Sequence, residues 1–262
     1  MDFENKINVT VIGCGNVGTH FCKSFLQERV KIVQVINRTE FWAKKIAQEV
    51  KADFSIEYNS IPENTDYIVI CVKDKEIENV IDNIPVGNYT VIHTSGTVSL
   101  EVFKNKFKKF GVVYPLQTFT KEKSLKLKTV PFFIESNTKE NLQNLKKFAL
   151  AYSANIWEAD SAKRKKIHLA AVFSCNFVNH LLVLSKEILK TEEIPLEILH
   201  PLIKETIEKA LLFGPEKVQT GPAVRGDDQT MKLHLELLAD KKDIQTLYKL
   251  ISQSIIEKHY DD

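Results

Sequence analysis

The feature that most constrains the fold of this chain is a glycine-rich stretch near its start, Val9–Gly18. An apolar run there breaks into the pattern G-x-G-x-x-G and continues into a helix-like pattern over residues 19–26. A buried parallel strand needs an apolar run, and a phosphate held at the start of the next helix needs backbone N–H groups that no side chain covers. In this motif Gly13 makes the tight turn, Gly15 lets a pyrophosphate approach, and Gly18 lets helix and strand pack. The context predicts a dinucleotide-binding site; a glycine-rich turn that serves packing alone is the alternative.

Length and composition favour a two-domain protein of an ordinary soluble class. The chain has 262 residues, 44% of them hydrophobic and 27% charged, and a net charge of +2, so neither a nucleic-acid nor a membrane partner is indicated. No apolar run reaches the roughly 18 residues of a membrane span, and the start of the chain has no apolar signal region. A cytoplasmic location is therefore expected.

The four cysteines show neither a C-x-x-C pair nor the spacing of a metal site. No metal site is therefore expected. Cys22, Cys71 and Cys175 are interpreted as small buried side chains.

Strand-like and helix-like segments alternate over the first 160 residues. Apolar runs typical of strands occupy residues 9–12, 31–36, 52–55, 66–72, 90–93, 111–119, 131–135 and 154–158. Helix-like patterns occupy residues 41–50, 74–84, 100–107 and 139–152. Such alternation is typical of a parallel sheet with helices on both faces. The sequence therefore predicts an α/β Rossmann-type, doubly wound parallel sheet that binds a dinucleotide over residues 1–160.

The pattern changes at residue 161, beyond which no strand is expected. Helix-like patterns at 162–189, 196–212, 227–238 and 242–257 predict an all-α C-terminal domain, residues 161–262, for substrate binding and dimerisation. The first of these helices is apolar on several sides, so it must be buried on several sides, within the domain or against a partner subunit. A homodimer through this domain is expected. The charge run Lys163–Lys166 is interpreted as a solvated helix start, with phosphate recruitment as the alternative.

The residues after the second strand favour NADP over NAD. An NAD site usually has Asp or Glu there to bind the ribose hydroxyls, and that acid would repel a 2′-phosphate. Here the position holds Asn37, followed by Arg38 and Thr39, whose side chains can donate to phosphate oxygens. The residues predicted to bind NADP are Gly13, Cys14, Gly15, Asn16, Val17, Gly18, Asn37, Arg38, Thr39, Val72, Lys73 and Thr94.

Loops at the carboxyl ends of later strands are expected to line the same crevice. Ser95 and Gly96 follow the fifth strand and Gln117 follows the sixth, so all three are predicted to bind substrate, and Ser95 is also a candidate catalytic residue. The other role open to Ser95 is the N-cap of the helix expected after it. His93 is interpreted as a buried histidine at the end of its strand rather than as a base.

Polar residues on the first long C-terminal helix indicate a proton donor. His168, Asn176 and Asn179 lie on or beside one sector of that helix, and polar side chains on an apolar helix need partners or a wet cleft. A histidine can protonate a carbonyl or imine during hydride transfer, so the three are candidate catalytic residues; a histidine satisfied at an interface is the alternative. Arg225 could clamp a substrate carboxylate or phosphate, or pair with a neighbouring aspartate.

Several of these motifs together resemble a known family. They are residues 13–18, 37–39, 114–119 and 168–180 and the segment T-G-P-A-V-R-G-D at 220–227. The family consists of bacterial proteins, usually described as NADP oxidoreductases, that join a Rossmann-like domain to a helical domain of unknown function. More distantly, the layout is similar to pyrroline-5-carboxylate reductase, ketopantoate reductase and the 3-hydroxyisobutyrate and 6-phosphogluconate dehydrogenases. The resemblance implies a helical domain that dimerises and helps close the site, and a substrate loop at residues 94–96.

The chain departs from the 3-hydroxy acid enzymes at one point. Those enzymes carry a catalytic lysine followed four residues later by an asparagine on the first long interdomain helix. Here His168 is followed four residues later by Val172, with Asn176 and Asn179 further along.

Two hypotheses about function stay open. In the first, the chain is an NADP-dependent oxidoreductase that moves a hydride between NADP(H) and a small carbonyl, imine or hydroxy-acid substrate in an interdomain cleft. In the second, it binds NADP(H) without turnover and reports the redox state to a partner. A flavin or deazaflavin hydride carrier is a third reading, which no residue pattern here supports.

Overall fold

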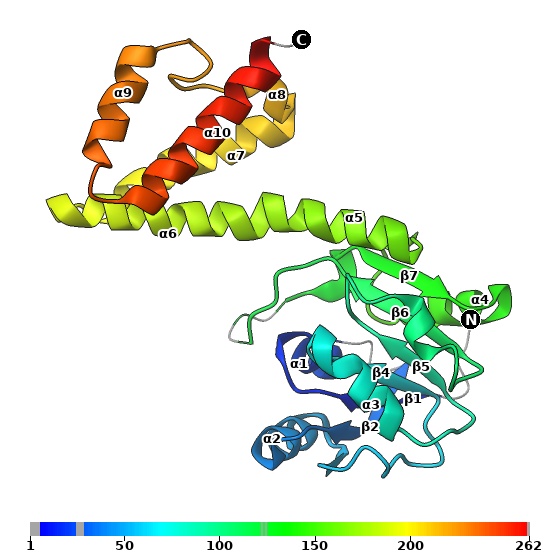
Figure 1. The fold of residues 1–262 in the computed structure, drawn as a ribbon. Coiled ribbons are helices and arrows are strands. Elements are labelled where there is room, and N and C mark those ends of the chain that lie inside the picture. The colour runs from blue at the N-terminus through cyan, green and yellow to red at the C-terminus, as the bar shows by residue number, and fades with distance from the viewer. Residues whose placement is uncertain (1–5, 25–28, 122, 124, 261–262) are drawn as a thin grey trace. The chain divides into compact units, whose positions relative to one another are not determined.

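A computed structural model describes residues 6–24, 29–121, 123 and 125–260 of the chain. By its contacts the chain forms two compact units, Met1–Asn176 and Phe177–Asp262, which we name the sheet unit and the helical unit (Figure 1). The last strand of the sheet ends at Glu158. The helix after it, which the sequence pattern assigns to the second domain, belongs by its contacts to the sheet unit.

An eight-stranded sheet organises the first unit, in the order β3-β2-β1-β4-β5-β6-β7-β8. Its strands are β1 (Ile7–Ile12), β2 (Val30–Ile36), β3 (Asp53–Ser55), β4 (Tyr67–Ile70), β5 (Thr90–His93), β6 (Phe110–Pro115), β7 (Phe132–Ser136) and β8 (Ile156–Glu158). The predicted Rossmann-type α/β fold is confirmed.

One pair of strands corrects the expectation of a wholly parallel sheet. Neighbouring strands pair parallel except β6 and β7, which pair antiparallel. In the described part of the connection between them, the only regular element is the 3-10 turn η3 (Leu127–Thr129). A parallel return needs a long crossover, usually a helix, so this connection turns the chain back in the opposite direction.

The helices of the sheet unit are α1 (Asn16–Lys23), α2 (Glu40–Val50), α3 (Ile77–Asn83), α4 (Lys139–Ala149) and α5 (Ser161–Ala171), with 3-10 turns η1 (Asp74–Glu76) and η2 (Leu100–Phe103). α1 begins at Asn16, earlier than the pattern over residues 19–26 predicts, because the helix starts directly at the glycine loop. The helix expected over residues 100–107 is wrong: only η2 forms there. Its N-cap is Ser99, whose side chain accepts the Glu101 N–H.

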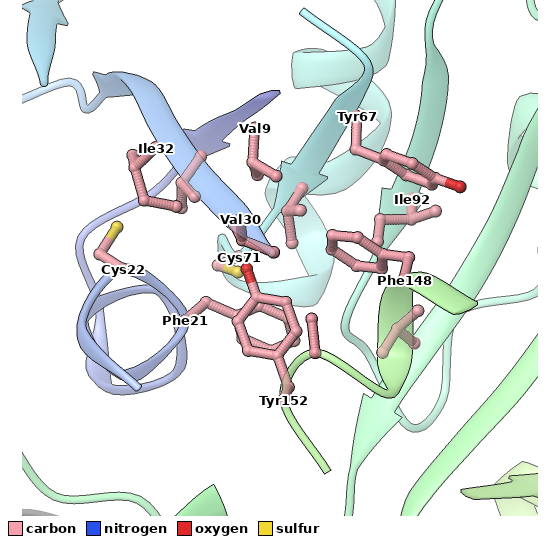
Figure 2. Packing of buried hydrophobic residues seen from close by; sticks show 14 of the residues in the cluster. Val9, Phe21, Cys22, Val30, Ile32, Tyr67, Cys71, Ile92, Phe148 and Tyr152 are labelled. Carbon is pink, nitrogen blue, oxygen red and sulfur yellow. The ribbon is translucent and has the colours of Figure 1, made fainter. Parts of the chain in front are cut away.

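The core lies on both faces of the sheet because side chains alternate along each central strand. One cluster contains Val9 and Tyr67, and Figure 2 shows the Tyr67, Phe148 and Tyr152 rings within it. The Tyr67 and Phe148 rings stack with centroids 4.4 Å apart. The other cluster contains Ile12 and its neighbours, packed against α3. The two clusters fix the strand ends from which the site is built.

The helical unit contains α6 (Val178–Leu189), η5 (Lys190–Glu192), η6 (Leu196–Leu199), α7 (His200–Phe213), α8 (Pro215–Val218), α9 (Asp228–Leu237) and α10 (Lys242–Tyr260). The predicted all-α region is thereby confirmed. A π-helical segment, η4 (Val172–Phe177), joins α5 to α6. Asp227 caps α9 by accepting the Thr230 N–H at 3.0 Å.

Large apolar side chains are exposed in the π-helical segment η4, among them Phe173 and Phe177. Cys175 lies beside them and is exposed, so its interpretation as a buried side chain is wrong. The interpretation relied on the apolar residues that flank Cys175 in the sequence, but in the structure these neighbours are themselves exposed.

The helical run Ser161–Glu192 is long and apolar enough to cross a membrane by length and composition, with a mean hydropathy of 1.7 in its most apolar window. The expectation that no segment reaches this size is therefore wrong, because uncharged polar residues interrupt the apolar run without lowering its average sufficiently. A single helix of this kind is weak evidence for a membrane span.

Candidate functional site

The glycine loop between β1 and α1 forms one wall of a cavity of about 600 Å³. Gly13 has φ +105°, and a Cβ there would lie 2.6 Å from the Cys71 carbonyl oxygen; a Cβ on Gly18 would lie 1.8 Å from the Gly13 carbonyl oxygen. Any larger residue at position 13 or 18 would therefore clash with the main chain of the neighbouring segments. Gly15 differs, since the nearest atom to its Cβ position is the Cys71 oxygen at 3.9 Å. The bare main chain at Gly15 is open to the cavity.

This loop fits the pyrophosphate of a dinucleotide. Gly15 is the N-cap residue of α1, and the first turn of α1 carries no acidic residue. The first N–H groups of a helix have no intrahelical acceptors and carry partial positive charge. A Cβ at Gly15 would fill the space through which a phosphate reaches those groups, so the fit depends on glycine there.

Asn37 braces the glycine loop from the end of β2. Its Oδ1 accepts the Cys14 N–H at 3.0 Å, and its Nδ2 donates to the Thr39 carbonyl at 3.0 Å. The sequence pattern suggested that Asn37 binds phosphate directly; in the structure its side chain bonds instead to the glycine loop and to the loop that follows β2. Arg38 lines the cavity beside it and is exposed.

The described residues that line the cavity are strongly basic. Four cationic side chains, Arg38, Lys73, Lys75 and Lys121, accompany one carboxylate, Glu76. Such a wall raises the local concentration of an anionic ligand. Of the residues predicted to bind the dinucleotide, the lining includes Gly13, Cys14, Gly15, Asn16, Val17, Asn37, Arg38, Val72 and Lys73, and it does not include Gly18, Thr39 or Thr94.

A second group of polar residues gathers on the loop after β5. The Ser95 Oγ accepts the N–H groups of Thr97 and Val98, each at 3.0 Å, and the Thr97 hydroxyl donates to the Asp74 carboxylate. Ser95 therefore stabilises a turn and is buried. The alternative that Ser95 caps a helix is wrong, because Ser99 caps η2.

His168, on α5, lies directly against this loop. A Cβ on Gly96 would be 2.8 Å from the His168 Nδ1, so only glycine permits the ring to sit there. The Tyr114 hydroxyl, at the end of β6, is 3.0 Å from the same nitrogen. Burial raises the pKa of Tyr114 to about 12, so the phenol stays protonated at neutral pH and can donate to Nδ1 when the ring proton of His168 is on Nε2. The structure thus joins a predicted catalytic residue to Tyr114, which the sequence pattern placed in a crevice-lining segment but gave no catalytic role.

Arg164 holds α5 against the sheet. Its side chain is fully buried, pairs with the Glu135 carboxylate and donates to the Val98 carbonyl and the Ser161 hydroxyl. The interpretation of the charge run at residues 163–166 as solvated is therefore wrong at Arg164, because one residue in each helical turn points to the sheet.

Burial also lowers the pKa of His93 to about 3, with the nearby Arg164 charge acting in the same direction. His93 is therefore a neutral, buried histidine at physiological pH, as expected.

Asn176 is exposed in η4, and Gln117 is exposed, with its Oε1 accepting the Thr118 N–H at 2.8 Å. Asn179, on α6, and Arg225 belong to the helical unit. Arg225 pairs with Asp227 at 3.8 Å. Among the described residues, no cluster of three or more His, Cys, Asp and Glu could hold a metal ion.

Comparison with known families divides the chain in two. Residues 8–95 match the family described as NADP oxidoreductase coenzyme F420-dependent, and residues 130–255 match a domain of unknown function (DUF2520). Among curated proteins, a glutamyl-tRNA reductase of Methanococcus maripaludis is 32% identical over 92 residues. That match covers 32% of this chain and 23% of the relative, so the chain aligns with less than a quarter of that protein.

Solved structures match nearly the whole chain. A protein of Bacteroides fragilis named as an NADP oxidoreductase is 36% identical with a TM-score of 0.88, over 96% of this chain and 98% of that one. A reductive aminase of Aspergillus terreus in complex with NADPH and ethyl-5-oxohexanoate has a TM-score of 0.74 at 12% identity, over 97% and 95% of the two chains.

A 1-pyrroline-5-carboxylate reductase of Streptococcus pyogenes has a TM-score of 0.65 at 11% identity, over 97% of this chain and 100% of that one. At these low identities the last two likenesses concern the fold alone. The family matches and the full-length similarity to the Bacteroides protein confirm the predicted resemblance. This chain belongs to the family of NADP oxidoreductases that joins an NADP oxidoreductase domain of the coenzyme F420-dependent type to a helical domain of unknown function.

Proposed function

We propose that this oxidoreductase uses NADPH to reduce a small carbonyl or imine compound beside His168. The observation that carries the proposal is the hydrogen-bonded pair of His168 and Tyr114 packed on Gly96. Tyr114 lies near the carboxyl end of β6 and Gly96 follows β5, both in the same unit as the basic cavity, and ligands of open α/β sheets bind outside those strand ends. The reductive aminase with a similar fold is named as binding NADPH and a keto ester, which supports a carbonyl or imine substrate.

NADP is the proposed cofactor, held by the glycine loop and by Arg38. The residue at the end of β2 is Asn37 rather than an acid, and the lining is basic, so a 2′-phosphate meets attraction instead of repulsion. When bound, NADPH supplies the hydride. The deazaflavin coenzyme F420, which the family description includes, is the alternative cofactor, and titration with F420 tests it.

We expect the protein to bind NADPH at least about tenfold more tightly than NADH, since a charge-assisted phosphate contact contributes ~1.5–3 kcal/mol. Replacing Arg38 by glutamine should remove most of this preference while changing NADH affinity less than about twofold. Isothermal titration calorimetry with both nucleotides and with coenzyme F420 checks it. A preference for NADH, or tight binding of F420 alone, would sink the NADP assignment.

His168 is proposed to give the proton and Tyr114 to position it. In this proposal the Tyr114 hydroxyl, 3.0 Å from Nδ1, donates to that nitrogen, so that a neutral His168 carries its proton on Nε2 and can donate it to the substrate oxygen or nitrogen. Arg164, one helical turn before His168, keeps α5 on the sheet through Glu135. Ser95 shapes the loop under the ring through its turn hydrogen bonds.

Substituting His168 by alanine should lower kcat by about 10²-fold, the usual contribution of a general acid, while the Kd for NADPH changes less than twofold. Tyr114→Phe keeps the ring but loses the donor to Nδ1, so kcat should fall by about tenfold. Asn179→Ala, in α6, is a comparison variant that tests another of the predicted catalytic residues. Consumption of NADPH with a panel of small ketones and imines gives the rates. Unchanged turnover in His168→Ala would remove His168 from the mechanism, and NADPH binding with no turnover of any compound would favour a redox sensor.

We further propose a soluble, cytoplasmic homodimer formed through the helical unit. Its helices expose large apolar side chains, among them Leu202, Leu211, Leu212 and Phe213, and exposed apolar surface is a feature of protein–protein interaction sites. A second copy of the chain would cover them. Light scattering after size-exclusion chromatography gives the mass, and a stable monomer at micromolar concentration would contradict the dimer.

A further inference from the structure

The loop after β6 is tied to the start of α1 at two successive peptide groups. The Asn16 Nδ2 donates to the Phe119 carbonyl at 2.7 Å, and a ring nitrogen of His20 lies 2.9 Å from the Thr120 carbonyl oxygen. The His20 and Phe119 rings also pack, with centroids 5.2 Å apart. These contacts fix the main chain immediately before Lys121.

Lys121 lies over an aromatic ring at the wall of the basic cavity. Its Nζ is 3.9 Å from the centroid of the Trp42 ring, on α2, and the residue is half-buried and lines the cavity. Burial raises the pKa of Cys14, in the glycine loop, to about 11, and the positive charge of Lys121 acts in the opposite direction. The charge of Lys121 therefore acts on the glycine loop. Attraction between an ammonium group and an indole face holds the cation there.

The strand order shows which end of a dinucleotide this cation would meet. β2 and β4 flank β1 on opposite sides. Arg38 and Trp42 follow β2, whereas Lys73 and Lys75 follow β4. The adenosine ribose of a dinucleotide binds at the end of β2. Lys121, on Trp42, therefore belongs to the β2 side of the cavity together with Arg38.

We propose that Lys121 is the second cation for the 2′-phosphate of NADP and a determinant of NADP over NAD specificity. The inference rests on the proposed function, since it takes NADP as the cofactor. A phosphomonoester carries a charge of about −1.5 to −2 at neutral pH, so Arg38 alone would leave part of it unbalanced. Lys121 supplies the second charge from a loop that follows the sixth strand, far in sequence from the glycine fingerprint.

Lys45 offers a matched control. Its Nζ is 5.1 Å from the centroid of the same Trp42 ring, but Lys45 is not among the residues that line the cavity. Replacing Lys45 by glutamine removes the same charge from the same indole without changing the lining of the cavity.

The test is a calorimetric titration of the full chain with NADPH and with NADH. Lys121→Gln should weaken NADPH binding about tenfold and change NADH binding less than twofold, as Arg38→Gln does, while Lys45→Gln should leave both affinities unchanged. The NADPH difference between wild type and Lys121→Gln should shrink as salt rises, because screening weakens the ion pair. The thermal transition of each unliganded variant shows that it is folded.

Three results separate the inference from the proposed function. Equal weakening of NADPH and NADH in Lys121→Gln would place the lysine on the pyrophosphate and overturn its role in specificity. Wild-type affinities in Lys121→Gln would overturn any contact. Wild-type protein that binds NADH as tightly as NADPH would instead overturn the proposed cofactor, whatever the variant does.

Discussion

Replacing Gly15 by alanine is expected to weaken NADPH binding by at least about a hundredfold, ~2.7 kcal/mol, and to leave the fold intact. The new Cβ has no protein atom closer than 3.9 Å, so it costs the unliganded protein little. It would occupy the space through which a pyrophosphate reaches the first N–H groups of α1. Calorimetric titration with NADPH and a thermal melt of the unliganded variant measure the two quantities.

Gly18→Ala is the matched comparison, because it adds the same methyl group three residues further along the chain, at the third residue of α1. There the Cβ would lie 1.8 Å from the Gly13 carbonyl oxygen, a main-chain atom that cannot move aside. Overpacking of this kind costs ~1–3 kcal/mol or more, so Tm should fall by several degrees. Wild-type NADPH affinity in Gly15→Ala would show that no phosphate passes over Gly15, and an unchanged Tm in Gly18→Ala would contradict the loop packing.

Glu135→Ala is expected to destabilise the protein by ~3–5 kcal/mol, because it leaves the Arg164 charge buried without its ion-pair partner. Arg164 has no exposed side-chain surface, and Glu135 also accepts the Ser161 N–H at 2.9 Å. Urea denaturation followed by circular dichroism gives the free energy of unfolding.

An exposed ion pair provides the control. Glu101 and Lys104 are 3.0 Å apart with both side chains more than 60% exposed, so Glu101→Ala should change the free energy of unfolding by less than about 1 kcal/mol. The double variant Glu135→Leu, Arg164→Met removes both buried charges and should recover much of the stability. If Glu135→Ala and Glu101→Ala cost the same, Arg164 is not a buried, paired charge.

The local patterns of the chain were sufficient for the fold class. Apolar runs of strand length and intervening helical patterns predicted the Rossmann-type sheet, and residues 13–18 predicted its glycine loop. These features follow from side-chain alternation and from steric limits within a few residues, so neighbouring sequence carries them. The antiparallel pairing of β7 was not predictable in the same way, because it depends on a connection whose described residues form no crossover helix.

The candidate site was only partly predictable. The pattern singled out His168 as one polar residue on an apolar helix, but Tyr114, 54 positions earlier, becomes its partner only when β6 and α5 pack together. Arg164 sits in a run of four basic residues, and which of them turns inward depends on Glu135 on β7.

The sequence by itself determined that an α/β sheet with a glycine loop precedes a helical region, and that Asn37, not an acid, directly follows the second strand. Only the tertiary structure decided which side chains meet: Asn37 braces the loop, Lys121 lies on Trp42, and His168 packs on Gly96 beside Tyr114. The physical reason is the distance along the sequence over which each interaction acts. Backbone preferences act over a few residues, whereas the charges and hydrogen bonds of the site join segments that lie 23 to more than 70 positions apart.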